Sequence, residues 1–248
     1  MRIGIDPSID IVFKAIFGRE KNKELLIDLL NSIMEENGEK KVVTIELLNP
    51  YNDKTFMKDK LSIVDIRAKN ELGEWFIIEM QVVVAEFFPK RLLYYWARAY
   101  QNQLKEKEHY HLLKKVTVIS ITKEDLPIAT KSYFNTFDLT SRSNNKLVLC
   151  EDLVIYTIEL SKFINNVDNL AKSLEKWTYF LKYGEDLDNE SLPVPLETPI
   201  MKQAVRELQK FSQSEIEREA YEARRMALMD EASKIYEMKI QTDGGKFC

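Results

Sequence analysis

The run SIVDIRAKNELGEWFIIEMQVV, residues 62–83, constrains the fold more than any other part of this 248-residue chain. Its centre, NELGE, is a polar turn that contains Gly73, and apolar-rich segments flank it on both sides. Two such segments around a short polar loop are typical of a β-hairpin. The sequence therefore predicts two antiparallel strands, at about residues 61–69 and 75–84.

The register of this hairpin follows from its turn. A turn centred on Leu72 places Asp65 opposite Glu79, with their side chains on one side and about 5 Å apart. Gln81 shares that side because alternate residues of a strand point the same way. A slip of one residue would move the carboxylates into the core. The even positions are all apolar: Val64, Ile66, Ala68, Phe76, Ile78, Met80 and Val82.

Two neighbouring carboxylates repel each other unless a cation lies between them or one is protonated. Mg²⁺ prefers oxygen ligands and keeps several waters, so it suits such a pair. It can polarise a phosphoryl oxygen and activate a water. The alternative is an ordinary exposed sheet face on which Arg67 and Lys69 neutralise the two acids.

The segments around the hairpin predict an order of helix, three strands, helix and strand. Leu25, Leu26, Leu29, Leu30 and Ile33 recur at helical spacing. The expected elements are a short helical turn at 9–17, a helix at 21–36, a strand at 41–48, a polar loop at 50–60, a long helix at 88–109 and a central strand at 116–121.

The predicted helix 88–109 has two distinct faces. Its apolar face is expected to hold Leu93, Trp96, Ala97, Tyr100 and Leu104. The other face carries Arg91, Tyr94, Arg98, Asn102 and Lys105, and it is either a solvated surface or a set of contacts to a nucleic-acid backbone. Arg91 and Arg98 are the predicted backbone contacts.

The C-terminal half is less regular. Strands are predicted at 133–139, 147–149 and 153–158, and a helix at 161–183. Residues 184–199 are acidic and contain prolines, so they are predicted to be a linker between a domain at 1–183 and a charged helical region at 200–240. The helical region gives no clean heptad, and a homodimer through it is a further hypothesis.

The chain resembles a known family. Asp, a hairpin turn and Glu-x-Lys form the core motif of the PD-(D/E)XK nuclease superfamily, and the Glu79-Met-Gln81 version is similar to the Rpn family of recombination-promoting nucleases, also labelled transposases. The resemblance covers most of the chain and is densest over residues 9–122. It is carried by Asp10-Ile-Val-Phe-Lys14 with Phe17-Gly18, Ile45–Pro50, Arg91–Trp96, Gln103-Leu104, Tyr221–Arg224 and Asp230–Ser233.

The resemblance implies an αβββαβ core, in which a mixed central sheet is flanked by helices as in restriction endonucleases, with a C-terminal helical extension. It implies metal ligands at Asp65 and Glu79, and a further acidic residue at Asp10. Gln81 takes the place of the usual lysine and can only hydrogen-bond. Lys14 or Lys69 is a candidate for the missing charge.

The net charge, the cysteines and the absence of other motifs argue against several other classes of protein. The net charge of −4 lacks the positive field of many nucleic-acid-binding proteins. Cys150 and Cys248 are far apart, and neither a signal peptide nor a long apolar run is present, so a reduced, cytoplasmic protein without a membrane span is expected. Phosphate-loop and nucleophile-elbow motifs are absent from the sequence.

The acidic hairpin and the resemblance together predict a metal-dependent DNA endonuclease, and the resemblance implies a role in recombination, transposition or defence against mobile elements. Asp65, Glu79 and the backbone carbonyl of Met80 would hold Mg²⁺ or Mn²⁺, and Gln81 would orient the attacking water. Lys14, Arg91 and Arg98 would contact DNA. The alternative is a nuclease-like fold that binds DNA or a protein partner without cutting.

Overall fold

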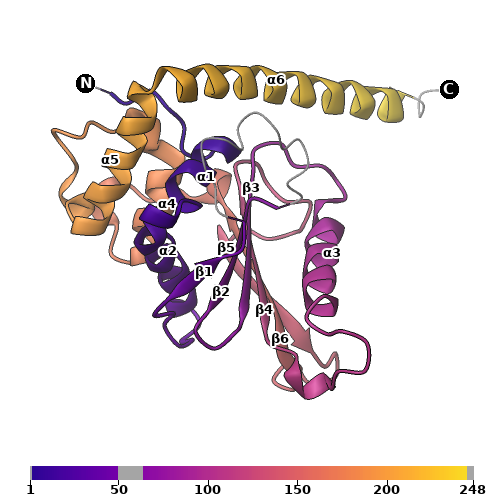
Figure 1. Cartoon of the computed structure of the whole chain (residues 1–248). Helices are drawn as coiled ribbons and strands as arrows, with labels where there is room; N and C mark the ends of the chain where they lie inside the picture. The colour runs from indigo at the N-terminus through magenta and orange to yellow at the C-terminus, as the bar shows by residue number, and fades with distance from the viewer. Residues whose placement is uncertain (1, 50–63, 245–248) are drawn as a thin grey trace.

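The computed structural model describes residues 2–49 and 64–244, and the predicted loop at 50–60 lies outside them. A mixed β-sheet forms the middle of the molecule (Figure 1). Helices α1, α2, α4 and α5 cover one face and α3 covers the other, while α6 runs across the top. This is the predicted α/β class, a mixed sheet flanked by helices with a C-terminal helix.

The helices and strands follow the predicted order, with two more strands after the αβββαβ core. The helices are α1 (Asp10–Phe17), α2 (Lys23–Glu35), α3 (Phe88–Gln101), α4 (Ser173–Tyr183), α5 (Pro199–Gln213) and α6 (Glu215–Gly244). The strands are β1 (Ile45–Leu47), β2 (Ile66–Asn70), β3 (Trp75–Gln81), β4 (Val116–Thr122), β5 (Phe134–Thr140) and β6 (Val148–Glu159).

The sheet has the strand order β1-β2-β3-β4-β6-β5, with β4 at its centre as predicted. Strands β1, β2 and β3 are antiparallel neighbours, whereas β4 runs parallel to both β3 and β6. In the hairpin, Ile66 pairs with Ile78 and Ala68 with Phe76, which is the predicted register. Gly73 has φ +82°, a conformation that glycine adopts without strain, and it closes the turn.

Two hydrophobic cores hold the layers together. The larger one lies between the sheet and helices α1, α2, α4 and α5, and it receives the even positions Phe76, Ile78 and Met80 of β3. The smaller one lies beneath α3 and receives Ile77. The odd face of β3 is therefore covered by a helix, and it is not the open polar face that its alternation suggested.

Helix α3 is shorter than predicted, and it buries a different face from the predicted one. It ends at Gln101, because residues 105–108 (KEKE) offer no apolar side chain for packing. Its buried residues are Phe88, Leu92 and Tyr95, while Leu93 is 51% exposed. The predicted apolar face was therefore displaced by about one residue around the helix.

Two other elements are shorter than the patterns indicated. Strand β1 begins only at Ile45, because the side chain of Asn31 binds both backbone groups of Val42. Helix α4 begins at Ser173 instead of residue 161. The carboxylate of Glu175 accepts hydrogen bonds from the backbone N–H groups of Ala171 and Lys172, which caps the helix there.

The acidic segment 184–199 is packed against the body of the protein. Leu187 and Leu196 are buried in the larger core, and the backbone of Gly4 donates to the carbonyl of Glu185. The predicted helical region consists of two helices, α5 and α6, which are separated at Ser214. The division into domains stays a prediction. None of the helices in the described part of the chain combines the length and apolar character that a membrane span requires.

Candidate active site

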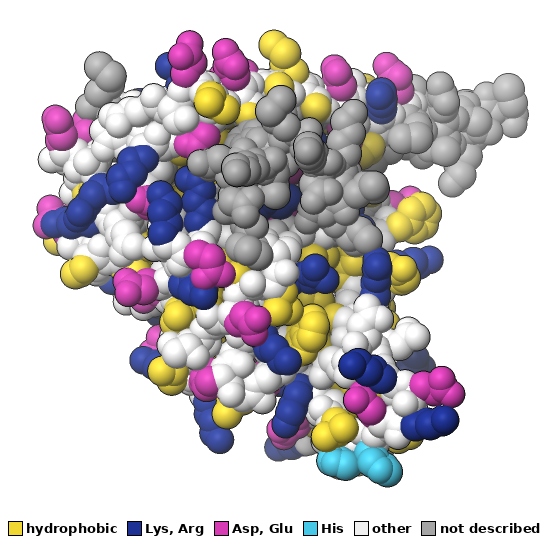
Figure 2. Space-filling view, in the orientation of Figure 1, with side chains coloured by type: hydrophobic (Ala, Val, Ile, Leu, Met, Phe, Trp, Pro, Cys, Tyr) yellow, Lys and Arg dark blue, Asp and Glu magenta, His cyan; other side chains and the backbone are white. Residues whose placement is uncertain are grey.

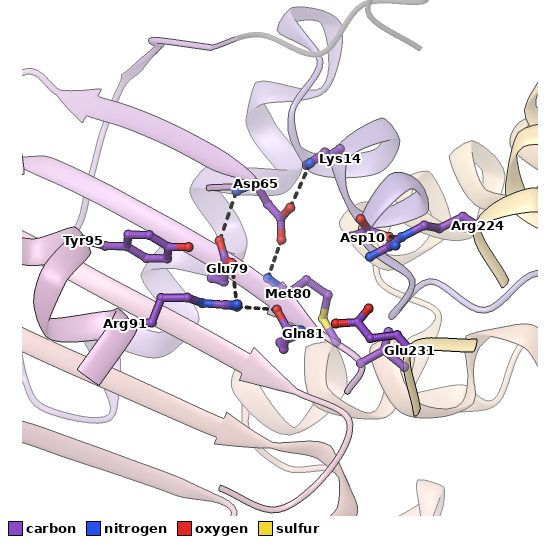
Figure 3. A pocket seen from close by; sticks show the side chains of 11 residues that line it. Asp10, Lys14, Asp65, Glu79, Met80, Gln81, Arg91, Tyr95, Arg224 and Glu231 are labelled. Atoms are coloured by element: carbon purple, nitrogen blue, oxygen red, sulfur yellow. Dashed lines mark hydrogen bonds and ion pairs between the residues drawn. The ribbon is translucent and has the colours of Figure 1, made fainter. Parts of the chain in front are cut away.

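Asp65 and Glu79 meet at one end of the hairpin, as the register predicts. The backbone N–H of Asp65 donates to Glu79 Oε2 over 3.3 Å, and the N–H of Met80 donates to Asp65 Oδ2 over 2.7 Å. Both carboxylates are largely buried, with side-chain exposures of 9% and 8%. The hairpin backbone therefore fixes the two acids side by side, and Figure 3 shows this arrangement.

Each carboxylate has a cationic partner from a different helix. Lys14 Nζ of α1 lies 3.0 Å from Asp65 Oδ1, and Arg91 Nη2 of α3 lies 3.1 Å from Glu79 Oε1. The alternative in which Arg67 and Lys69 neutralise the acids is wrong. Arg67 is exposed, and Lys69 lies 5.6 Å over the ring of Trp75.

Burial of this pair opposes its ionisation. Burial, and then repulsion by Asp65, raises the pKa of Glu79 to about 8, although Arg91 acts in the opposite direction. Burial also raises the pKa of Asp65; Asp10 adds to this effect, and Lys14 counteracts it. Burial alone would lower the pKa of Lys14, but Asp65, Asp10 and Glu79 outweigh it, so that this pKa is raised. The two local cations thus leave the carboxylates under-compensated.

Gln81 shares the side of Glu79, as expected, and both ends of its amide are engaged. Its Nε2 donates to the carbonyl of Val83 over 2.7 Å, and its Oε1 accepts a hydrogen bond from Arg91 Nη2. The same guanidinium nitrogen therefore contacts Glu79 and Gln81, which joins the two motif residues of β3 to helix α3.

A cavity of about 230 Å³ lies over this end of the hairpin. Lys14 and Asp10 reach it from adjacent turns of α1, and Asp10 Oδ1 accepts a bond of 2.8 Å from Arg224 Nε of α6. The residues that line the cavity are Asp10, Lys14, Asp65, Glu79, Met80, Gln81, Val82, Arg91, Tyr95, Arg224 and Glu231 (Figure 3).

Three polar lining residues were not predicted as site residues: Tyr95, Arg224 and Glu231. Tyr95 follows Arg91 by four residues, and Glu231 follows Arg224 by seven, so that each pair occupies one side of its helix. This spacing was readable in the sequence. What the sequence lacked was any sign that α6 lies over the hairpin.

Arg98, a predicted DNA contact, does not line the cavity. It is exposed on α3, two helical turns beyond Arg91. The predicted stripe on this helix is therefore divided between Arg91, which lies within the site, and Arg98, which lies on the outer surface.

The donor set fits a hard divalent cation. Asp65 and Glu79 supply carboxylate oxygens that retain lone pairs beyond their present hydrogen bonds, and their raised pKa values indicate a place where positive charge is lacking. Within residues 2–49 and 64–244, no group of three or more acidic, histidine or cysteine residues could hold a metal. A metal here would rely on two carboxylates, backbone oxygen and water, the pattern typical of Mg²⁺.

The fold and this pair of strand-borne carboxylates define a PD-(D/E)XK nuclease-like protein. A family model described as PD-(D/E)XK nuclease family transposase matches residues 7–238, from just before α1 into α6, and the chain belongs to this family. Neither the curated proteins nor the solved structures compared with it give a significant match. The family indicates a nuclease acting on DNA, and such nucleases generally use divalent metals.

Proposed function

We propose that this protein is a metal-dependent DNA endonuclease that hydrolyses phosphodiester bonds. The observation that carries the proposal is the buried pair of Asp65 and Glu79, held side by side by the hairpin, with two cations that do not fully balance them. This is the arrangement that a divalent cation would complete. The family match supports the choice of DNA as the substrate.

Asp65, Glu79 and the backbone carbonyl of Met80 would hold Mg²⁺, with Mn²⁺ as an alternative. When bound, the cation would supply an activated water and polarise the phosphoryl oxygen. The protein's own part is to fix the two carboxylates through the Asp65 and Met80 N–H bonds and to exclude bulk water by burying them.

The remaining residues would hold and orient the reactants. Gln81 would hydrogen-bond the attacking water, and Lys14 would lie beside a phosphate oxygen. Asp10 would hold Lys14 and Arg224 at the site, since it pairs with Arg224 and lies one helical turn from Lys14. Hydrolysis forms a bond from water oxygen to phosphorus, breaks the bond from phosphorus to the sugar oxygen, and leaves a proton on that oxygen.

The surface supports a local contact with DNA despite the net charge of −4. Figure 2 shows several Lys and Arg side chains close together on the side of the molecule that carries α5, whereas acidic side chains are frequent along α6. Phosphate contacts require only such a local gathering of cations. Arg98 would add a backbone contact on the side of α3.

The Rpn resemblance favours a role in recombination, transposition or defence against mobile elements. A homodimer through α6 remains part of the proposal, because Met226, Met229 and Tyr236 are more than 60% exposed on it. Sedimentation of wild type beside Met226→Glu would test the dimer. A cytoplasmic location stays a prediction.

A second function is a DNA- or protein-binding module that does not cut. It is favoured by the absence of a lysine at residue 81 and by the engagement of both ends of the Gln81 amide. This module would bind a divalent cation and DNA without turnover.

Plasmid cleavage with Mg²⁺, with Mn²⁺ and without metal separates the two functions. We expect metal-dependent nicking or linearisation that Asp65→Ala abolishes. The matched control is Asp138→Ala, because Asp138 is an exposed aspartate on the edge strand β5. Equal cleavage by wild type and Asp65→Ala, or none with either metal, would overturn the endonuclease and leave the binding module.

A further inference from the structure

Gln81 leaves the proposed nuclease without a cation at the third position of its motif. A glutamine amide can donate and accept hydrogen bonds, but it carries no charge to stabilise the phosphate in the transition state. The inference below rests on the proposed function and concerns which residue of this chain supplies that charge.

The guanidinium of Arg91 lies directly at this position. Its Nη2 donates both to Gln81 Oε1 and to Glu79 Oε1, the latter over 3.1 Å. Its carbon Cζ lies 4.4 Å over the ring of Phe88 and 5.8 Å over that of Tyr95. A side chain held by two motif residues and two aromatic rings is fixed in place before substrate arrives.

Arg91 also keeps capacity for a ligand. It lines the cavity, and its side chain is 37% exposed. Both bonds to the motif residues come from one terminal nitrogen, whereas a guanidinium has five N–H donors. The Nε atom has no hydrogen-bond partner within the described part of the chain but is buried, so the donors left for a ligand are those of the other terminal nitrogen, Nη1. A phosphate oxygen in the cavity could therefore be bound without breaking the bond to Gln81.

The other nearby lysines are less suited to this role. Lys14 contacts Asp65, on the opposite strand of the hairpin, and none of its hydrogen bonds reaches Gln81 in the described residues. Lys69 of β2 lies over the ring of Trp75, which precedes Gln81 by six residues on β3. Lys69 does not line the cavity. Of these three cations, Arg91 is the one joined to residue 81.

We infer that Arg91 is a catalytic residue that takes the role of the motif lysine, with its guanidinium delivered from helix α3 instead of from strand β3. Arg91 donates hydrogen bonds to a non-bridging oxygen of the scissile phosphate and stabilises its growing negative charge. It keeps all of its protons throughout. The proton balance of hydrolysis is carried by the water and the leaving sugar oxygen.

The test returns the lysine to residue 81 in a chain that lacks Arg91. Four proteins are compared: wild type, Arg91→Met, Arg91→Lys and the double variant Arg91→Met with Gln81→Lys. The matched control is Lys90→Met, which removes an exposed cation from the neighbouring position of α3. Each is measured for kcat on saturating duplex DNA, for the Kd of a labelled duplex in EDTA, and for its melting temperature.

We expect Arg91→Met to lower kcat by roughly 100-fold or more, the usual effect of removing one preorganised donor. Its Kd in EDTA should change by less than about 3-fold, because one phosphate contact among many is lost. Arg91→Lys should retain part of the activity. The double variant should regain about 10-fold or more over Arg91→Met, and Lys90→Met should match wild type.

The outcomes separate this inference from the proposed function. A wild-type protein that cuts, together with an Arg91→Met variant that keeps kcat within about 3-fold, would overturn the inference alone. A double variant that melts normally but regains nothing would also overturn it. No cleavage by wild type would overturn the proposed function and this inference together. If Arg91→Met melts early, Arg91→Lys and Gln81→Lys, each in the otherwise intact chain, carry the comparison.

Discussion

Two groups of hydrogen-bonded carboxylates in this protein differ in the number of acids that their cations must neutralise. The site pair, Asp65 and Glu79, places two acids against two cations, Lys14 and Arg91. The Glu39 cluster places one acid between Lys115 and the hydroxyl of Tyr156, and it lines a second cavity of about 510 Å³.

The difference lies in how the negative charge is balanced. Glu39 is a single carboxylate that receives a hydrogen bond on each oxygen, one of them from an ammonium group. The site pair holds two buried carboxyl groups so close that Asp65 opposes the ionisation of Glu79. A carboxylate with matched donors is suited to stabilising a fold, whereas a buried pair that repels is suited to binding a cation.

The largest expected difference between the two clusters is in DNA cleavage. Glu79→Gln should lower metal-dependent DNA cleavage by roughly 1,000-fold, because it removes a metal-binding charge from the site. Glu39→Gln should leave kcat within about 3-fold. Initial rates of plasmid nicking measure both, and equal losses in the two variants would show that the site pair has no special role.

In the free energy of unfolding, by contrast, Glu39→Gln should have a clear effect. Glu39→Gln should lower the free energy of unfolding by about 1–3 kcal/mol, because a charged acceptor is removed from Lys115 and from the buried Tyr156 hydroxyl. Urea denaturation measures this change. The matched control is Glu151→Gln, an exposed glutamate on β6. A loss no greater than that of the control would contradict the structural role of Glu39.

The third prediction concerns pH in metal-free protein. The pKa of Glu79 is raised from 4.5 to about 8 in the folded state, so the folded state binds the extra proton between these values. The stability of wild type relative to Glu79→Gln should therefore fall as pH rises through this window. Urea midpoints of both proteins between pH 5 and about 8 would check the sign, and a constant or rising difference would exclude it.

The fourth and smallest effect is expected at the rim of the site. Arg224→Met removes the partner of Asp10 from a partly buried ion pair, which should cost on the order of 1 kcal/mol. The variant should melt within a few degrees of wild type. The control is Arg225→Met, whose side chain is 56% exposed and pairs within α6. A larger loss for Arg224→Met than this would mean that α6 is anchored mainly through Asp10.

The site pair could be predicted because its geometry is local. An apolar residue at every even position and a five-residue turn fix which residues of the hairpin face each other, and Asp65 and Glu79 follow from that count. The position of β4 was similarly readable, since its sequence is almost wholly apolar or β-branched, and all seven of its residues are buried in the structure.

The partners of the pair could not be derived in this way. Lys14 and Arg91 belong to helices whose orientation depends on packing across the sheet, and the expected apolar face of α3 was displaced by about one residue. The ends of β1 and α4 were likewise decided by the side chains of Asn31 and Glu175, which bind backbone groups. Hydrogen bonds from side chains to the backbone compete with strand pairing and helix formation, and they leave no periodic pattern in the sequence.

The cavity is assembled from contacts made at very different times during synthesis. The bond between Asp65 and Glu79 closes over 14 residues, whereas that between Asp10 and Arg224 closes over 214. At translation rates of about 5–20 residues per second, the second bond must wait roughly 10–40 s after Asp10 is made. A nascent chain would thus contain both residues of its acidic pair well before the ribosome delivers the helix that completes the rim.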